Sequence, residues 1–347
     1  MTSPQPGEAV AEKEPMLMAT GTPSPTKETQ TTATTTGAGV IRPGDRVFQI
    51  LSVGSSWLVT IIIAAVGVFL LMRAVPSLMN NDANFFTYGG EWNLADTTAM
   101  QFGIPNLFFT TVTVSLVALI IAMPIALGIA IFLSNYCPKS WVRPLGFLVD
   151  LLAAVPSIVY GIWGFMVLGP FLGPFYDWIN SWAGGFVLFA LHENSPSFST
   201  SRNLFTGGIV LAIMILPIIA STAREVFVQT PKGHIESALA LGATRWEVVR
   251  MTVLPFGLSG YISGSMLGLG RALGETMALY MVIASSAAFT GSLFDGGNTF
   301  ATHIALHAQE FNNDLMAGAY MSAGLVLFFL TFIVNAAARA VVGKASA

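Results

Sequence analysis

The stretch ESALALGATRWEVVRMTVLP, residues 236–255, is a polar segment lying between two long apolar runs. Residues 236–241 are acceptable to good helix formers, and Gly242 suits the left-handed turn that ends many helices. Thr244 and Glu247 have the spacing of a capping box, so a second helix is expected to start at once. The segment therefore predicts a short helix, a glycine turn and another helix.

Flanking prolines and apolar side chains complete this prediction. Pro231 suits the first turn of the first helix, and Pro255 is expected to stop or redirect the chain before the next apolar run. The two helices would expose Ile235, Ala238 and Leu239 as a small apolar knob. An ordinary helix lying at a membrane interface is the alternative reading of the same segment.

The composition places the chain in a lipid bilayer. Hydrophobic residues make up 54% of the sequence and charged residues only 10%, with a mean hydropathy of +0.69. A soluble globule of 347 residues with this composition would expose far too much apolar surface. The net charge of -3 says little about partners beyond the membrane, and we expect no nucleic acid among them.

Six apolar runs are long enough to cross a bilayer, which predicts an all-α polytopic membrane protein. They cover about residues 47–74, 106–133, 145–169, 205–223, 257–287 and 315–340.

Three regions follow from these runs. Residues 1–46, rich in Thr, Pro, Ser and Gly, are expected to be a disordered cytoplasmic tail, either functional or simply tolerated. Residues 47–104 hold the first span and an external loop. Residues 105–347 form a core of the remaining spans, with the polar loop at 225–256.

Basic residues predict the orientation. With the N-terminus inside, cytoplasmic segments hold most of the 15 lysines and arginines, namely Lys13, Lys27, Arg42, Arg46, Lys139, Arg143, Arg224, Lys232, Arg245, Arg250, Arg339 and Lys344. This bias puts both termini and the polar loop in the cytoplasm. The external segments 75–105, 170–204 and 288–314 could receive a soluble binding protein, or could be solvated loops with aromatic anchors.

The fifth span contains GYISGSMLGLGRALGETMALY, residues 260–280. At about 100° per residue, its regularly spaced glycines and two charged residues share roughly an 80° sector of a helix. These residues are Gly260, Gly264, Gly268, Arg271 and Glu275. Glycines at every fourth position let another helix approach closely, so we interpret them as helix-packing positions.

Arg271 and Glu275 are the candidates for chemistry in this span. A charge at mid-bilayer costs about 2.5 to 3.5 kcal/mol, so such residues usually face a polar pathway or a partner. Spaced i,i+4, the two side chains could form a structural ion pair, or Arg271 could stand on a substrate path. The planar donors of a guanidinium match phosphate oxygens, which favours an oxyanion substrate.

Several stretches resemble a known family. Residues 236–255 resemble the EAA loop of ABC-importer permeases, the cytoplasmic element that docks on an ATPase subunit. GRALGETMA at 270–278 and AAVPSIVYGIWG at 153–164 are similar to the phosphate-specific permeases of this kind. The GETMA sequence fits the PstC-type subunit better than its PstA-type partner. The resemblance covers about residues 105–340.

The resemblance implies a type I permease fold of six transmembrane helices in a bacterial inner membrane. It implies that phosphate is moved inward by an assembly with a PstA-type second permease, a PstB-type ATPase dimer and an external PstS-type phosphate-binding protein. ATP and Mg²⁺ would belong to the ATPase, so this chain would need no cofactor and would not be an enzyme. The ATPase-coupling residues would be Ile235, Glu236, Ala238, Leu239 and Gly242.

Residues of the third span are further pathway candidates. Pro156, Tyr160 and Gly161 match a motif of the family, which implies a bend near the pathway. Proline and glycine also occur in spanning helices without such a role. Asp150 could act in transport. Alternatively, its side chain could simply extend to the cytoplasmic boundary of the membrane or pair with a charge there.

Other functions are less well supported. His303, His307 and Glu310 could present one metal-binding face, but an amphipathic interfacial helix has the same pattern, so we expect no metal. The sequence contains no GxxxxGK[ST] phosphate loop. A PstA-type subunit, or a permease for sulfate or molybdate, is the nearest alternative. A stand-alone secondary transporter would need more ionisable groups within the membrane.

Overall fold

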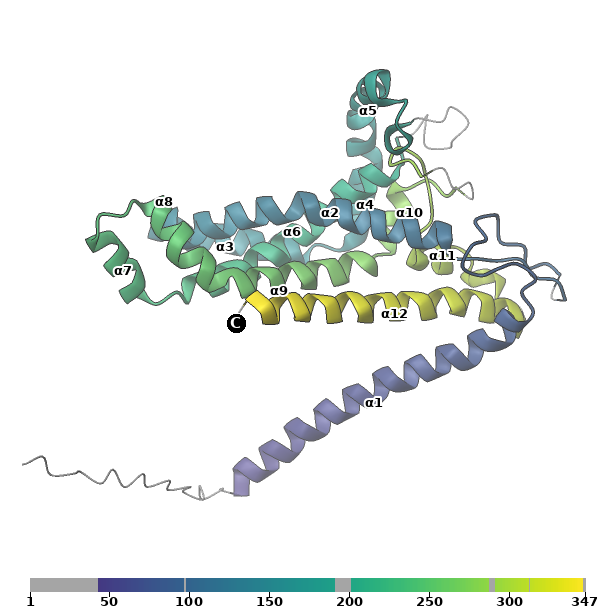
Figure 1. Ribbon diagram of the computed structural model, residues 1–347, viewed down its shortest axis with the longest axis horizontal. Coiled ribbons are helices and arrows are strands. Elements are labelled where there is room, and N and C mark those ends of the chain that lie inside the picture. The colour runs from purple at the N-terminus through teal and green to yellow at the C-terminus, as the bar shows by residue number, and fades with distance from the viewer. Residues whose placement is uncertain (1–42, 97, 191–200, 287–290, 312, 346–347) are drawn as a thin grey trace, which may run out of the picture. The chain divides into compact units, whose positions relative to one another are not determined.

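The chain folds almost entirely into helices (Figure 1). The computed structural model describes residues 43–96, 98–190, 201–286, 291–311 and 313–345. The longer helices are α1 Pro43–Met79, α2 Pro105–Ile131, α3 Lys139–Ala154, α5 Gly169–Ala183, α6 Leu204–Val228, α9 Leu254–Leu273 and α12 Asp314–Ala345. The shorter ones are α4 Ser157–Trp163, α7 Lys232–Ala240, α8 Arg245–Val248, α10 Met277–Val282 and α11 Phe300–Leu306. No strand occurs in these ranges, so the predicted all-α fold is confirmed.

The described residues divide into two units between Trp57 and Leu58, and the functional features all lie in the second. The predicted tail lies outside the described residues as far as residue 42. α1 begins at Pro43, earlier than the expected start of the first span.

Five helical stretches of the described residues are long and apolar enough to cross a membrane. They are Gly44–Met79, Pro105–Tyr136, Ser157–Ala183, Leu204–Val228 and Asp314–Ala340. Four of them match predicted spans, but the third predicted span, 145–169, has the wrong bounds. The chain is extended at Val155 and Pro156, which separates α3 from α4. Proline disfavours helical geometry in the residue before it, so the helix restarts at Ser157 and runs on to Ala183.

The fifth predicted span, 257–287, is also not one helix. α9 ends at Leu273, and Gly274, Glu275 and Thr276 separate it from the short α10, which ends at Val282. The prediction that Glu275 shares a helix face with Arg271 is therefore wrong, because the helix on which that geometry depends stops before Glu275.

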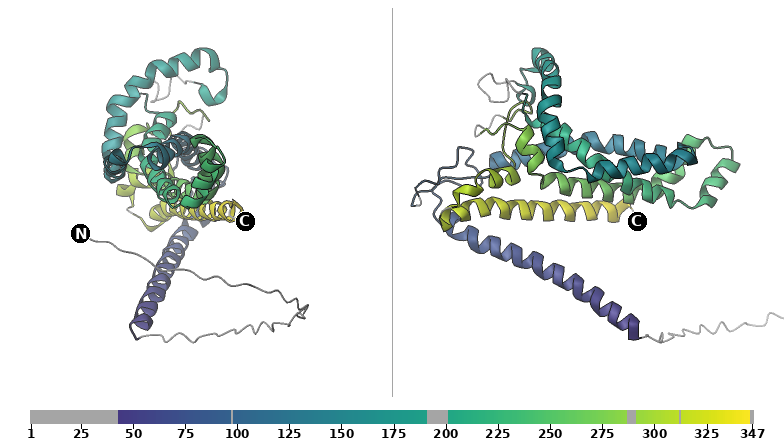
Figure 2. Two further views of the ribbon diagram at one scale, coloured as in Figure 1. Left: turned by 90° about the vertical axis from the view of Figure 1, so that its left-hand side faces the viewer. Right: turned by 180° about the vertical axis from the view of Figure 1, so that it is seen from behind.

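The core of the second unit is built around α6, which packs against α2 on one side and α9 on another, with α12 along α9 (Figures 1 and 2). Val210, Leu211, Ile215 and Ile219 of α6 are fully buried. α4 lies against α10. One end of α6 leads into α7. The opposite end of the helices, where loop 80–104 and α11 lie, is called the outer end below, a name that follows the predicted orientation.

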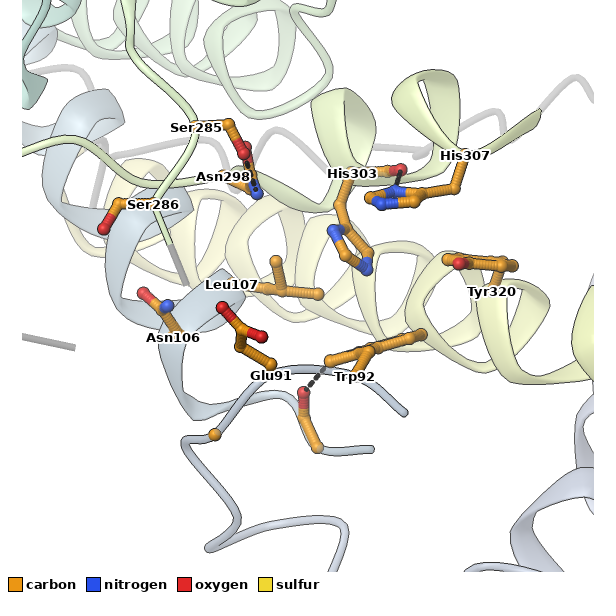
Figure 3. A pocket seen from close by; sticks show the side chains of 12 residues that line it. Glu91, Trp92, Asn106, Leu107, Ser285, Ser286, Asn298, His303, His307 and Tyr320 are labelled. Atoms are coloured by element: carbon orange, nitrogen blue, oxygen red, sulfur yellow. Dashed lines mark hydrogen bonds between the residues drawn. The ribbon is translucent and has the colours of Figure 1, made fainter. Parts of the chain in front are cut away.

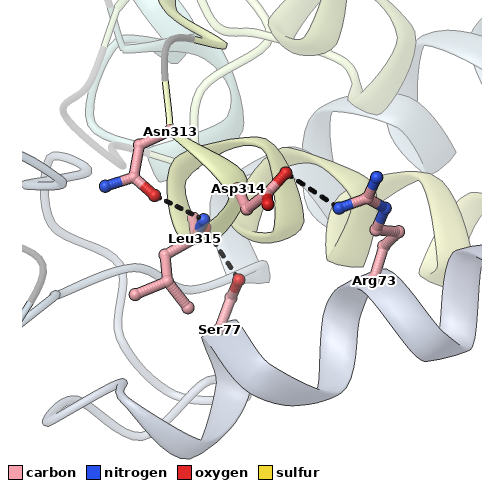
Figure 4. Close-up of polar contacts among 5 residues, drawn as sticks. All are labelled: Arg73, Ser77, Asn313, Asp314 and Leu315. Carbon is pink, nitrogen blue, oxygen red and sulfur yellow. Dashed lines mark hydrogen bonds and ion pairs between the residues drawn. The ribbon is translucent and has the colours of Figure 1, made fainter.

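The outer end of α1 is fastened to α12 (Figure 4). Arg73 Nη1 lies 2.9 Å from Asp314 Oδ1, and Ser77 Oγ donates to the main-chain oxygen of Leu315 at 2.7 Å. Both charged side chains are well exposed, so the ion pair itself contributes only about 0–1 kcal/mol to the stability of the fold. A Cβ at Gly318 would collide with Ser77, so this crossing depends on a small residue.

Loop 80–104 is an ordered cap and not merely a solvated loop. Met100 and Phe102 are fully buried and cluster with Ala319 and Tyr320 of α12. Trp92 packs against this cluster and donates from Nε1 to the main-chain oxygen of Gly103 at 2.9 Å. The loop thus covers the outer part of α12.

The glycines of α9 face α6, as predicted. A Cβ at Gly264 would lie 2.9 Å from Thr222 Cβ, and one at Gly268 would lie 3.0 Å from Ile219 Cγ1. Gly260 similarly adjoins Val226. The close approach of α9 to α6 therefore requires these small residues.

A pair of alanine variants tests this packing. Gly264→Ala is expected to destabilise the protein by about 1–3 kcal/mol, because the added methyl overlaps Thr222. Gly270→Ala is the matched control, since its Cβ would have no atom within 4 Å. Thermal unfolding in detergent should show a lower Tm for the first variant alone. Equal Tm values would contradict the packing role.

Candidate functional site

The loop between α6 and α9 has the helix–glycine–helix form that its sequence predicts. α7 spans Lys232–Ala240, and Gly242 has φ of +87°, in the region that favours glycine. Thr244 and Glu247 form the predicted capping box: Thr244 Oγ1 accepts from Glu247 N at 3.4 Å, and Thr244 N donates to Glu247 Oε2 at 2.7 Å. The hydrogen bonds from the Thr244 backbone and hydroxyl lower the pKa of Glu247.

One local prediction for this loop is wrong. Pro255 does not stop the chain, because α8 continues through a π-helical turn, Val249–Val253, directly into α9. Proline is tolerated there because it occupies the first turn of α9.

The loop is open to its surroundings. No residue of α7 is buried; Ile235 and Ala238 are half-buried, while Glu236 and Leu239 are exposed. Leu241 is 90% exposed, and Trp246 and Met251 are also exposed. Sequence reasoning missed these three, although apolar residues within a polar segment were the available signal. These exposed apolar side chains lie together on a small two-helix element, and such a surface has the properties of a docking site.

Arg271 lies in a groove between α9 and α12. It is exposed, and it lines a hollow of about 510 Å³ with Ile218 of α6 and Thr331 of α12. A second hollow of about 400 Å³ shares Met266, Leu267 and Asn335 with the first and extends the groove to Arg339. Arginine therefore occurs at both ends of a groove with apolar walls.

Glu275 has a different role from the one its spacing suggested. It is 9% exposed, and its Oε1 accepts from Ala278 N at 3.2 Å, which caps the start of α10. The described residues contain one ion pair within 4.0 Å, between Arg73 and Asp314, so Arg271 and Glu275 do not form one.

Tyr160 and Asp150 are the other predicted pathway residues. Tyr160 is buried in α4, and its hydroxyl donates to the main-chain oxygen of Leu152 at 2.8 Å, across the break between α3 and α4. Gly161 lets α4 approach Ala278 of α10 closely. The extended backbone at Pro156 confirms a bend at this motif. Asp150 is exposed on α3 and has no described link to Arg271.

A polar pocket of about 330 Å³ lies at the outer end (Figure 3). Its walls include Glu91, Asn106, Asn298, His303 and Tyr320. His303 is 6% exposed, and burial, with His307 nearby, lowers its pKa to about 3. The ring therefore stays neutral, packed against Trp92 at a centroid distance of 4.5 Å.

The described residues contain no cluster of three histidine, cysteine or carboxylate side chains that could hold a metal. His307 Nδ1 instead contacts the main-chain oxygen of His303 at 2.9 Å. The side chain of Glu310 lies outside the described part.

Comparison with known proteins identifies the family. Residues 123–346 match the model of the binding-protein-dependent transport system inner membrane component. The chain belongs to this family. It is therefore a multi-pass membrane component of a transport system.

Similar members of this transport family occur in mycobacteria. The chain is 52% identical over 303 residues to phosphate transport system permease protein PstC 2 of Mycobacterium tuberculosis, covering 87% of this chain and 93% of that protein. It is 50% identical over 309 residues to the PstC permease protein of Mycobacterium leprae, with 88% and 96% covered.

Solved structures of ABC transporters share the fold. The inward-facing MetNI methionine ABC transporter gives a TM-score of 0.51 at 18% identity, covering 70% of this chain and 95% of that chain. A bacterial alginate ABC transporter bound to its periplasmic protein gives a TM-score of 0.50 at 15% identity, covering 86% and 96%. These likenesses support the predicted importer-permease fold.

Proposed function

We propose that this chain is the PstC-type permease subunit of an ATP-driven phosphate importer and forms one half of its translocation pathway. The names of the mycobacterial relatives suggest phosphate as the substrate. The structural observation that supports this chemistry is the guanidinium of Arg271, which lies in an open groove with no described carboxylate within 4.0 Å. Such a group binds an oxyanion through charge and paired donors.

The groove needs a second chain to become a pathway. Arg271 is exposed and Leu267 is 62% exposed, although their helix α9 packs along α12, which is long and apolar enough to cross a membrane. A PstA-type permease covering this groove would enclose the substrate between the two subunits. Glu275 would act by capping the start of α10, and Tyr160 by holding the bend between α3 and α4.

The α7–α8 loop would bind the ATPase. Ile235, Ala238 and Leu239, with the exposed Leu241 and Trp246, offer an apolar surface to a groove on a PstB-type subunit. ATP and Mg²⁺ would be held there and not in this chain. α8 continues into α9 without a break, so a displacement of the loop would be transmitted along α9 toward Arg271.

The transport cycle follows from this coupling. Closure of the ATPase pair on ATP would rock the helices, and the groove would open alternately outward and inward. An external PstS-type binding protein would deliver phosphate at the outer end. The distribution of lysine and arginine supports a bacterial inner membrane protein with both termini in the cytoplasm.

The test is purification of the tagged chain from native membranes, followed by reconstitution. We expect an ATPase, a second permease and a phosphate-binding protein to accompany it, and uptake of radiolabelled phosphate to require ATP. Sulfate and molybdate serve as competing substrates. Preferential uptake of either one would overturn the assignment to phosphate, and uptake without an ATPase would indicate a secondary transporter.

A further inference from the structure

A second arginine lies at the outer end of α10. Arg202 Nη2 donates to the main-chain oxygens of Tyr280 and Ile283, each at 3.2 Å. Its guanidinium also lies over the ring of Phe165, 5.2 Å from the ring centroid. Contacts with these three residues therefore hold the guanidinium in one orientation.

Arg202 lines a hollow of about 230 Å³ between α10, α11 and the chain before α6. Its other polar walls come from Tyr280, Ser285, Asn298 and Thr302. Among its lining residues, all of them in the described ranges, Arg202 is the one charged side chain. A water molecule occupies about 30 Å³ in the liquid, so the hollow has room for a five-atom oxyanion and several waters.

The charge of Arg202 is not balanced by the protein as described. Arg73 has Asp314 at 2.9 Å, whereas no described carboxylate lies within 4.0 Å of Arg202. The Nε of Arg202 is buried and has no hydrogen-bond partner in the described part of the chain. A partly buried cation without a counter-ion is costly, and an anion in the hollow would offset that cost.

Ser285 supplies an oriented donor beside this charge. Asn298 Nδ2 donates to Ser285 Oγ at 3.0 Å. Because the hydroxyl oxygen already accepts this hydrogen bond, its own proton is available to a ligand. A guanidinium and a free hydroxyl donor suit an anion with several acceptor oxygens.

We propose that Arg202 and Ser285 form an outer subsite for an oxyanion, through which the substrate passes before it reaches Arg271. The proposal rests on the phosphate transport function given above. Arg271 precedes α10, Met277–Val282, in the chain, and Arg202 contacts the main chain at the end of α10, a helix about 9 Å long. Tyr280 and Met277 of α10 are 43% and 52% exposed.

The experiment measures the charge and the ligand at this subsite directly. The complex carries Leu306→Cys, at a half-buried position that lines the hollow, and Cys137, the one cysteine of the sequence, is replaced by serine. It is labelled with a negatively or a positively charged methanethiosulfonate. With Arg202 present, the negatively charged reagent should label the cysteine about fivefold faster than in the Arg202→Gln variant, as expected for one nearby unit charge. Arg202→Lys should retain the preference. Thr98→Cys, on the exposed part of loop 80–104, is the matched control site.

Phosphate should slow labelling at position 306 when arginine or lysine is present at position 202, compared with chloride at equal ionic strength. If phosphate does not slow labelling in the complex with unaltered Arg202, the proposed subsite is wrong. This result does not depend on whether the Arg202→Gln variant assembles. Equal labelling rates for Arg202 and Arg202→Gln would also overturn it, leaving Arg202 as a helix cap. ATP-dependent phosphate uptake by the complex with unaltered Arg202 separately tests the proposed function.

Discussion

Arg271→Gln is expected to reduce ATP-dependent phosphate uptake at least about tenfold, the equivalent of ~1.4 kcal/mol of lost binding free energy, while the complex still assembles. Glutamine keeps hydrogen-bonding capacity but removes the charge from the groove between α9 and α12. The side chain is exposed and has no described carboxylate partner, so its loss leaves no buried charge uncompensated. Assembly should therefore persist.

Controls for this variant separate the substrate role from a structural one. Arg73→Gln removes an arginine from the outer end of α1, where the charge pairs with Asp314, and should leave uptake nearly unchanged. Uptake of radiolabelled phosphate is normalised to the complex recovered from membranes. Normal uptake by Arg271→Gln would remove this residue from the pathway.

The double variant Arg271→Gln/Glu275→Gln should remain inactive. Removing both charges would restore transport if the two residues formed only a structural ion pair. In the structure Glu275 caps α10 through Ala278 N and is not within 4.0 Å of Arg271. Full rescue in the double variant would refute the contact between Arg271 and substrate.

Gly242→Asp is expected to remove most of the ATPase that copurifies with the chain. Gly242 has φ of +87°, a conformation that costs other residues about 1–2 kcal/mol, and it fixes the angle between α7 and α8. A Cβ there would have no atom of this chain within 4 Å, and aspartate, like asparagine, tolerates the left-handed region better than most residues, so the effect should come mainly from a charge on the docking surface.

Gly242→Asn is the matched control, since asparagine has the same shape without the charge and tolerates left-handed geometry. We expect it to retain more ATPase than Gly242→Asp. Copurified ATPase is measured against the permease recovered, with phosphate uptake in parallel. Normal recovery of ATPase and normal uptake for Gly242→Asp would show that the α7–α8 loop is not the dock.

Local rules predicted the features that depend on neighbouring residues. The turn at Gly242 and the capping box of Thr244 and Glu247 were predictable because each involves a few consecutive residues. The packing face of Gly264 and Gly268 was predictable because the helix is continuous over that stretch, so spacing determines direction.

The sequence by itself thus determined the all-α membrane fold, the two-helix loop and the glycine face of α9. Tertiary structure decided where the helices break and which side chains meet. The break after Leu273 moves Glu275 off the face of Arg271, and helical periodicity cannot locate such a break. The hollow of Arg202 combines residues from 202 to 306, and the groove of Arg271 combines α6, α9 and α12. Periodicity describes one helix at a time, whereas a binding site depends on how separate helices pack together.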